Sequence, residues 1–269
     1  MNLPKGIISM QIALISIAAA YLILLFSFHQ FQEYFMFFPD SLPRKHNYTH
    51  PNFEREFFVK SGKNEINYAL FSKGKSDSLC VYFHGNAHNI EHYSQFINPI
   101  LEKGVDVLIV DYPTFGKSTG KIYPDVFYEV AMATQKFIGD SLNHKTVTVY
   151  GKSLGTGVAT YFAQDFKVDK IILETPYEKF SNAVGRLGAI FPTDLMIRYR
   201  LNNVTNLKNS EVPVYIIHGT SDFIIKYQEA EKIKSAYPNR VKLTLVEKGK
   251  HNNLTEFPEY QKFIDEAFQ

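Results

Sequence analysis

A glycine-flanked serine, in the pentapeptide Gly-Lys-Ser-Leu-Gly at residues 151–155, is the segment best suited to chemistry. Residues 146–150 before it are β-branched and aromatic, as in a buried strand, and residues 156–166 after it have a helical pattern. The glycines allow a sharp strand-to-helix turn that exposes the hydroxyl of Ser153, and the helix N-terminus behind it favours developing negative charge. The pattern therefore indicates a nucleophile, provided that an acid, a histidine and oxyanion donors accompany it.

An acid and a histidine follow later strands in the order that such a serine needs. Residues 214–217 run as a strand into a tight loop with Asp222, and residues 242–246 run into a loop with His251. His251 would take the proton from Ser153, and Asp222 would orient the imidazole and stabilise its protonated form. Alone, the aspartate would be interpreted as a turn cap and the histidine as a solvated loop residue. Their order and their places at strand ends favour the catalytic interpretation.

Backbone donors for an oxyanion are expected in the loop His-Gly-Asn-Ala at residues 84–87, which follows another apolar run. Its glycine permits a close turn, and the backbone N–H of Asn86 could pair with that of Leu154 to bind a tetrahedral oxyanion. Ala87 is the alternative donor, because the sequence does not decide which amide points inward. The histidine of this loop and His218 are interpreted as residues that brace their loops.

Rival interpretations exist for several of these residues. Asp111 and Glu174 also end strands, but these strands precede the usual position of the acid. Residues 88–92, His-Asn-Ile-Glu-His, fit the zinc pattern of inverted-motif metallopeptidases, in which a helix places both histidines on one face. No clear third ligand accompanies them, so surface histidines on an exposed helix face are the preferred interpretation and no metal is expected.

Short apolar runs alternate with segments of helical period along the rest of the chain. This alternation predicts an α/β fold: a mostly parallel sheet of about eight strands, helices on both faces, and an antiparallel hairpin at one edge. Sites in such sheets lie beyond the carboxyl ends of the strands, where the three loops above are expected to meet. The expected strands are residues 53–60, 65–71, 79–83, 105–110, 146–150, 170–173, 214–217 and 242–246.

One connection, residues 177–211, is too long for a simple crossover. It is expected to form a short lid that carries an apolar pocket, a pair of helices packed on the sheet edge, or both. Its apolar residues are Phe180, Leu187, Ile190, Phe191, Leu195, Met196 and Ile197.

The amino-terminal segment has the length and composition of a membrane anchor. Residues 7–28 contain no charged side chain, and as a helix they span roughly 33 Å, enough for a hydrocarbon core of about 30 Å. A cleaved signal peptide is the competing interpretation, but the apolar run continues beyond the Ala-x-Ala match at residues 18–20. An interfacial aromatic belt is expected from Tyr21, Phe31, Tyr34, Phe35, Phe37 and Phe38.

The chain is therefore divided into a membrane anchor at residues 1–33, a linker at residues 34–52 and an α/β domain at residues 53–269. Orientation in the membrane stays open, although Lys5 and the amino terminus are the nearer charges and favour an internal amino terminus.

Length allows one large α/β domain or two small ones, and composition supplies enough apolar residues for a core but gives no support for nucleic-acid binding. The 269 residues are 45% hydrophobic, and the formal net charge is only +2 with no lysine- or arginine-rich run. The single cysteine, Cys80, lies in an apolar run and is expected to be a small buried residue. No cofactor is expected, because catalysis by serine, histidine and aspartate needs none.

Taken together, these motifs resemble the α/β-hydrolase superfamily over roughly residues 34–268. They look closest to membrane-anchored serine hydrolases with a His-Gly-Asn-Ala oxyanion loop, a group that includes protein depalmitoylases and lipid hydrolases. The resemblance rests on His-Gly-Asn-Ala at 84–87, Asp-Tyr-Pro-Thr-Phe-Gly-Lys-Ser at 111–118, Gly-Lys-Ser-Leu-Gly at 151–155, His-Gly-Thr-Ser-Asp at 218–222 and His-Asn-Asn-Leu at 251–254.

This resemblance implies a triad and an oxyanion hole, and it implies an α/β-hydrolase fold with one amino-terminal membrane helix. The triad would be Ser153, Asp222 and His251, with Asn86 and Leu154 as oxyanion donors. Two departures lie near the pocket: His88 stands where relatives usually have glycine, and Pro-Thr at 113–114 stands where they have Arg-Gly. Both bear on the substrate and not on the chemistry.

The function that these features favour is a membrane-anchored serine hydrolase. It would cleave a carboxylic ester or thioester, with a lipid-like acyl group, through an acyl-enzyme on Ser153. The membrane helix and the apolar lid motivate the acyl preference. The alternatives are a serine peptidase of the same fold and a non-catalytic, membrane-tethered binding protein.

Overall fold

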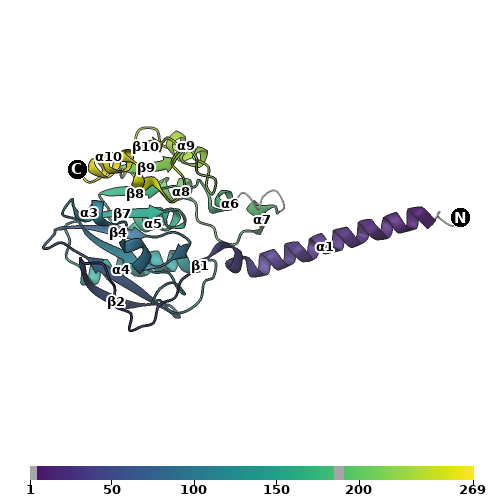
Figure 1. Cartoon of the computed structure of the whole chain (residues 1–269), viewed down its shortest axis with the longest axis horizontal. Helices are drawn as coiled ribbons and strands as arrows, with labels where there is room; N and C mark the ends of the chain where they lie inside the picture. Colours follow the sequence, from purple (N-terminus) through teal and green to yellow (C-terminus); the bar gives the residue numbers. More distant parts are fainter. Residues whose placement is uncertain (1–4, 185–190) are drawn as a thin grey trace.

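An eight-stranded sheet forms the centre of the protein (Figure 1). The computed structural model describes residues 5–184 and 191–269. The strand order is β10-β9-β8-β7-β4-β6-β3-β2; neighbours from β10 to β6 are parallel, and β3 and β2 are antiparallel. The mostly parallel sheet of eight strands with a hairpin at one edge is thus confirmed. The strands are β2 (Phe53–Ser61), β3 (Asn64–Phe71), β4 (Ser78–Phe83), β6 (Asp106–Val110), β7 (Thr146–Lys152), β8 (Lys170–Glu174), β9 (Val214–Gly219) and β10 (Val241–Val246).

Alternate residues of each strand point to opposite faces of the sheet and belong to two apolar cores. In β4, Leu79, Val81 and Phe83 lie in one core, and Cys80 and Tyr82 lie in the other. Helices α4, α5 and α9 contribute to the first core, and α2, α3 and α10 to the second, so helices cover both faces. These helices are α2 (Ile90–Ser94), α3 (Asn98–Leu101), α4 (Val126–Ser141), α5 (Leu154–Asp165), α9 (Gln228–Ala236) and α10 (Pro258–Ala267).

The carboxyl ends of the central strands lie side by side. At these ends Phe83 of β4 pairs with Gly151 of β7, and Lys152 of β7 pairs with Glu174 of β8. The last residues of β9 and β10 pair in the same way. The loops that follow these strands therefore emerge at one edge of the sheet, which is where doubly wound sheets place their sites.

Helix α1 (Lys5–Met36) projects far from the domain (Figure 1). Side chains 6–24 are all exposed, and the helix is long and apolar enough to cross a membrane by length and composition. Its carboxyl-terminal part is different, because Phe28, Gln32 and Met36 are buried at helical spacing against the domain. The ring of Phe28 stacks on that of Phe191 with centroids 4.3 Å apart.

The segment expected to be a linker is packed on the domain. Strand β1 (Phe38–Pro39) pairs with β5 (Ala87–His88), and the ring of Phe37 lies in the core against that of Phe127. Burial of Phe37 removes it from the expected aromatic belt, whereas Phe31, Tyr34, Phe35 and Phe38 are exposed. We call residues 36–42 the strap, because they join α1 to the domain surface.

The long connection contains three short helices among its described residues: α6 (Phe180–Ala183), α7 (Thr193–Met196) and α8 (Asn203–Leu207). Helix α8 packs on α5, and α7 lies beside the end of α1 (Figure 1). Leu187 and Ile190 of the expected lid lie outside the described residues.

Candidate active site

Ser153 stands at a strained turn between β7 and α5. Its φ of 51° and ψ of −115° lie in a region that residues with a side chain rarely adopt. The flanking glycines make this turn possible: a Cβ on Gly151 would lie 2.5 Å from the carbonyl oxygen of Gly155, and one on Gly155 would lie 2.0 Å from that of Phe83. The turn is thus built as the pentapeptide predicts.

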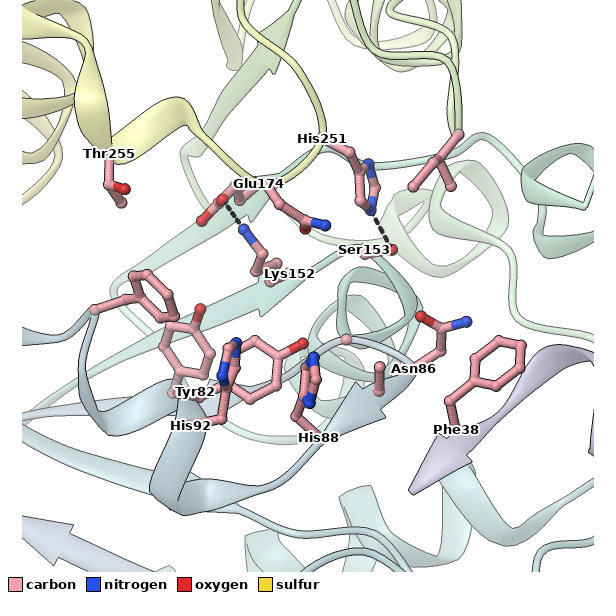
Figure 2. A pocket seen from close by; sticks show the side chains of 16 residues that line it. Phe38, Tyr82, Asn86, His88, His92, Lys152, Ser153, Glu174, His251 and Thr255 are labelled. Atoms are coloured by element: carbon pink, nitrogen blue, oxygen red, sulfur yellow. Dashed lines mark hydrogen bonds and ion pairs between the residues drawn. The ribbon is translucent and has the colours of Figure 1, made fainter. Parts of the chain in front are cut away.

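The structure brings together the three side chains that the sequence placed in separate loops, and Figure 2 shows two of them, Ser153 and His251, side by side. Nε2 of His251 lies 3.1 Å from Oγ of Ser153, and Nδ1 of His251 lies 2.6 Å from Oδ2 of Asp222. All three residues are less than one-tenth exposed. A hydroxyl, an imidazole and a carboxylate therefore form one continuous chain of hydrogen bonds.

Asp222 is held ionised by its surroundings. Burial by itself would raise the pKa of this carboxyl, but hydrogen bonds from His218, His251 and the backbone N–H of Ile225 lower the pKa well below its ordinary value. Its Oδ1 also accepts from the backbone N–H of Ile224 at 2.8 Å. A carboxylate with this many donors keeps a fixed orientation toward the imidazole.

The rival acids have other partners. Oδ1 of Asp111 lies 3.2 Å from Nε2 of His84 and accepts from a backbone N–H at the start of α2. Glu174 pairs with Lys152 and accepts a hydrogen bond from a tyrosine hydroxyl. Among the described residues, Asp222 is therefore the carboxylate that contacts the imidazole next to Ser153.

The loop after β4 lies directly against the serine. A Cβ on Gly85 would be 3.7 Å from Cβ of Ser153 and 2.8 Å from the hydroxyl oxygen of Tyr93, so any larger residue would have to displace that hydroxyl. Within residues 5–184 and 191–269, the amides of Asn86 and Leu154 donate to no backbone carbonyl. Leu154 is the first residue of α5, and N–H groups in the first turn of a helix lack intrahelical acceptors.

Two buried histidines brace these loops, as their context suggested. Nδ1 of His84 donates to the carbonyl oxygen of Gly85 at 2.8 Å, and its Nε2 faces Asp111. Nε2 of His218 lies 3.3 Å from Oδ2 of Asp222. Each histidine thus joins a loop of the site to a neighbouring buried carboxyl group.

The zinc pattern does not take the geometry of a metallopeptidase helix. His88 lies in β5 with a φ of 64°, ahead of the short helix α2, and its ring stacks on that of His92 with centroids 4.1 Å apart. The Glu91 carboxylate has other partners than these two histidines. It accepts a hydrogen bond from the backbone N–H of Thr49, and it lies 3.1 Å from Nε2 of His46. The expectation that a helix would carry both histidines is therefore wrong for this segment.

A cavity of about 460 Å³ opens beside Ser153 (Figure 2). Rings of Tyr82, Tyr93 and Phe38 form part of its wall. The described residues of the 177–211 segment do not line it, so the apolar pocket expected in the lid is not formed by that part of the chain. The reason is that this part packs on the docked end of α1 and on α5 instead.

Lys152, Glu174 and Phe38 are among the residues of the cavity wall that the sequence reasoning missed. Lys152 and Glu174 form an ion pair there, and Phe38 reaches the wall from the strap. Lys152 lies inside the pentapeptide, and Glu174 is the last residue of a strand. The two residues are paired across β7 and β8, so a prediction of the pairing register of these strands would have placed them side by side. No local pattern points to Phe38.

Comparison with known proteins agrees with this architecture. A family model described as the alpha/beta hydrolase fold matches residues 80–207. The human protein ABHD12B is 28% identical over 207 residues, which cover 67% of this chain and 57% of that protein. The lysophosphatidylserine lipase ABHD12 of Danio rerio is 25% identical over 182 residues, which cover 59% of this chain and 47% of that protein.

A solved structure extends the likeness to most of the domain. The esterase Pf2001 of Pyrococcus furiosus superimposes with a TM-score of 0.69 at 19% identity, covering 86% of this chain and all of that one. At this identity the likeness concerns the fold. The chain therefore has the α/β-hydrolase fold, and the family match together with the relatives supports its membership of the α/β-hydrolase superfamily.

Proposed function

We propose that this protein is a serine hydrolase that cleaves carboxylic esters or thioesters through an acyl-enzyme on Ser153. The observation that carries the proposal is the chain of hydrogen bonds from Ser153 through His251 to Asp222, beside a cavity large enough for an acyl group. The relatives named as an esterase and a lipase support ester hydrolysis as the general activity.

In the proposed mechanism, Oγ of Ser153 attacks the carbonyl carbon while its proton moves to Nε2 of His251. The backbone N–H groups of Asn86 and Leu154 donate to the resulting oxyanion, and Asp222 stabilises the imidazolium. The intermediate collapses by breaking the bond to the leaving oxygen or sulfur, which takes the proton from Nε2. Water then attacks the acyl-enzyme with the imidazole as base, releasing the acid and the free serine.

Covalent labelling by a fluorophosphonate probe tests the nucleophile. We expect the wild-type protein to be labelled, Ser153→Ala to be unlabelled, and kcat for an ester to fall by about 10⁴-fold or more in this variant. Ser221→Ala, which changes a serine in the loop of the acid, serves as the matched control and retains labelling. Equal labelling of the wild type and Ser153→Ala, or an unlabelled wild type, would refute the mechanism.

We further propose that the acyl group is lipid-like. Phe38 lines the cavity only two residues after α1 ends, so the cavity lies next to the point where the apolar helix meets the domain. An apolar wall at this position suits a hydrocarbon chain that leaves a bilayer.

A panel of p-nitrophenyl esters of two to sixteen carbons, with matching thioesters and amides, tests this acyl preference. We expect kcat/KM to rise with chain length over the short members of the series, because each buried CH₂ contributes about 0.8 kcal/mol, close to fourfold. Faster cleavage of acetate than of medium chains would contradict the lipid proposal, and preferred cleavage of the amides would favour a peptidase.

Helix α1 is proposed to anchor the protein in a membrane without being cleaved. Its apolar side chains at residues 6–24 are exposed and fit a hydrocarbon core. We expect the full-length protein to stay in the membrane pellet after an alkaline carbonate wash and its intact mass to include residues 1–20, which cleavage at the Ala-x-Ala match would remove. Release into the wash, or a mass that lacks this segment, would show that the helix is not a permanent anchor.

A further inference from the structure

The end of α1 is fixed to the domain by polar contacts as well as apolar ones. Gln32 is fully buried; its Nε2 donates to the carbonyl oxygen of Met196 at 3.2 Å, and its Oε1 accepts from the backbone N–H of Arg198 at 2.9 Å. Glu33 accepts from the hydroxyl of Tyr199 at 3.1 Å. Because breaking buried hydrogen bonds leaves groups unsatisfied, this docking defines one position for the last turns of the helix.

The strap joins this docked helix to the loop beside Ser153. Nδ2 of Asn86 donates to the carbonyl oxygen of Met36 at 2.7 Å, and the backbone N–H of Phe38 donates to the carbonyl oxygen of Asn86 at 2.8 Å. The first bond satisfies one of the carbonyls that a helix C-terminus leaves without partners. β1 then continues the contact by pairing Phe38 with Ala87.

These contacts hold the Gly85–Asn86 peptide from two sides. The carbonyl oxygen of Gly85 accepts from Nδ1 of His84, which is itself braced by Asp111. The side-chain amide and the carbonyl of Asn86 are both bound to the strap, and its backbone N–H has no hydrogen-bond acceptor among the residues that the structure describes. The direction of that N–H is therefore set jointly by a buried histidine and by the end of the membrane helix.

We propose that the docked end of α1 and the strap position the oxyanion loop, with the Asn86 side chain as the positioning group. This inference rests on the proposed serine hydrolase mechanism, and it gives α1 a role in catalysis beyond that of a tether. Oxyanion stabilisation depends on donors that are already oriented before the charge develops, and a displacement of about 1 Å can cost up to 100-fold in rate. If the loop were released from the strap, the backbone N–H of Asn86 would still be present, but it would no longer be held in the direction of the oxyanion.

The test uses Asn86→Ala in the full-length protein in detergent micelles, with p-nitrophenyl octanoate as substrate. We expect kcat to fall by about 10- to 100-fold, less than the loss of an entire oxyanion donor, while KM changes by less than about twofold. The second-order rate of fluorophosphonate labelling should fall in parallel, because phosphonylation uses the same oxyanion donors.

Asn89→Ser is the matched control. Nδ2 of Asn89 also donates to the strap, to the carbonyl oxygen of Asp40 at 2.9 Å, but this residue lies outside the loop and caps α2. Serine keeps a capping oxygen and loses the bond to the strap, so we expect kcat within about twofold of the wild type. An unchanged kcat in Asn86→Ala, or an equal loss in both variants, would overturn the proposal.

A second variant keeps the proposal testable if Asn86→Ala does not fold. Phe37→Leu shrinks the buried ring that fixes the strap between Phe127 and Tyr199 and leaves the loop itself intact. We expect a several-fold lower kcat with little change in KM, and an unchanged kcat in the folded variant would refute the inference. Failure of the mechanism itself is distinguishable, because the wild type would then not be labelled at Ser153.

Discussion

Asp222→Asn is expected to lower kcat by about 10⁴-fold while KM and the fold are retained. Asparagine keeps an acceptor for the backbone N–H groups of Ile224 and Ile225, so the loop stays in place. Its NH₂ group, however, would donate to Nδ1 of His251, which moves the imidazole proton to Nε2. In this tautomer Nε2 cannot accept the proton of Ser153. Steady-state kinetics on an ester, with circular dichroism to confirm folding, measures the effect.

Glu229→Gln is the matched control for this prediction. Glu229 is also a buried carboxylate with several hydrogen bonds, to the backbone N–H of Glu178 and to Asn182, and it does not contact His251. We expect its kcat to stay near that of the wild type. If Asp222→Asn retained more than one-tenth of the activity, or if both variants lost activity equally, the assignment of the acid would be wrong.

The lowered pKa of Asp222 also predicts how the difference in Tm between the wild type and Asp222→Asn depends on pH. Since the folded-state pKa lies below the unfolded value of about 4, the ionised carboxylate stabilises the fold fully above that value, and this contribution disappears as the pH falls through the folded-state pKa. The difference in Tm between wild type and Asp222→Asn should therefore be largest near neutral pH and should shrink below about pH 4. A difference independent of pH would contradict the lowered pKa.

Gly155→Ala is expected to abolish folding or to destabilise the protein by about 4 kcal/mol or more. The new Cβ would lie 2.0 Å from the carbonyl oxygen of Phe83 and 2.6 Å from that of His84. These are backbone atoms at the end of the central strand β4, so they cannot move without breaking its pairing with β7. Soluble yield and thermal unfolding of the purified protein measure the loss.

Gly139→Ala provides the control for a glycine in a helix. Gly139 is exposed in α4, and a Cβ there meets no atom within 4 Å. We expect this variant to be unchanged or more stable by about 0.5–1 kcal/mol, because alanine loses less conformational freedom on folding. A normally folded Gly155→Ala with a wild-type Tm would mean that the approach of α5 to β4 is looser than the structure shows.

The sheet was predictable because each strand carries a local signal. Residues 146–150 were expected as a strand from their β-branched pattern, and β7 extends it to Lys152 because pairing with Glu174 of β8 continues to the end. Likewise α5 begins at Leu154, two residues before the expected start, because the turn at Ser153 leads directly into the helix. Differences of about two residues between the expected and the observed ends of an element arise where hydrogen bonds to other segments define those ends.

The candidate site was partly predictable for a related reason. Ser153, Asp222 and His251 follow strands whose carboxyl ends must meet at one edge of a parallel sheet, so their proximity follows from topology. Their catalytic roles stay a prediction until the variants above are measured. The zinc pattern shows the opposite case: its spacing has meaning only on a helix, and His88, with a φ of 64°, lies outside α2 and pairs with Pro39 of the strap.

Local patterns in the chain were enough to name the strands, the turn at Ser153, the order of the acid and the histidine, and an apolar helix of membrane-spanning length. They could not show that this helix ends docked on the domain, that Phe37 is buried, or that Phe38 lines the cavity. Those features depend on contacts such as that between Met36 and Asn86, which are 50 positions apart. Such a contact leaves no periodicity in either segment, because it is set by the path of the folded chain.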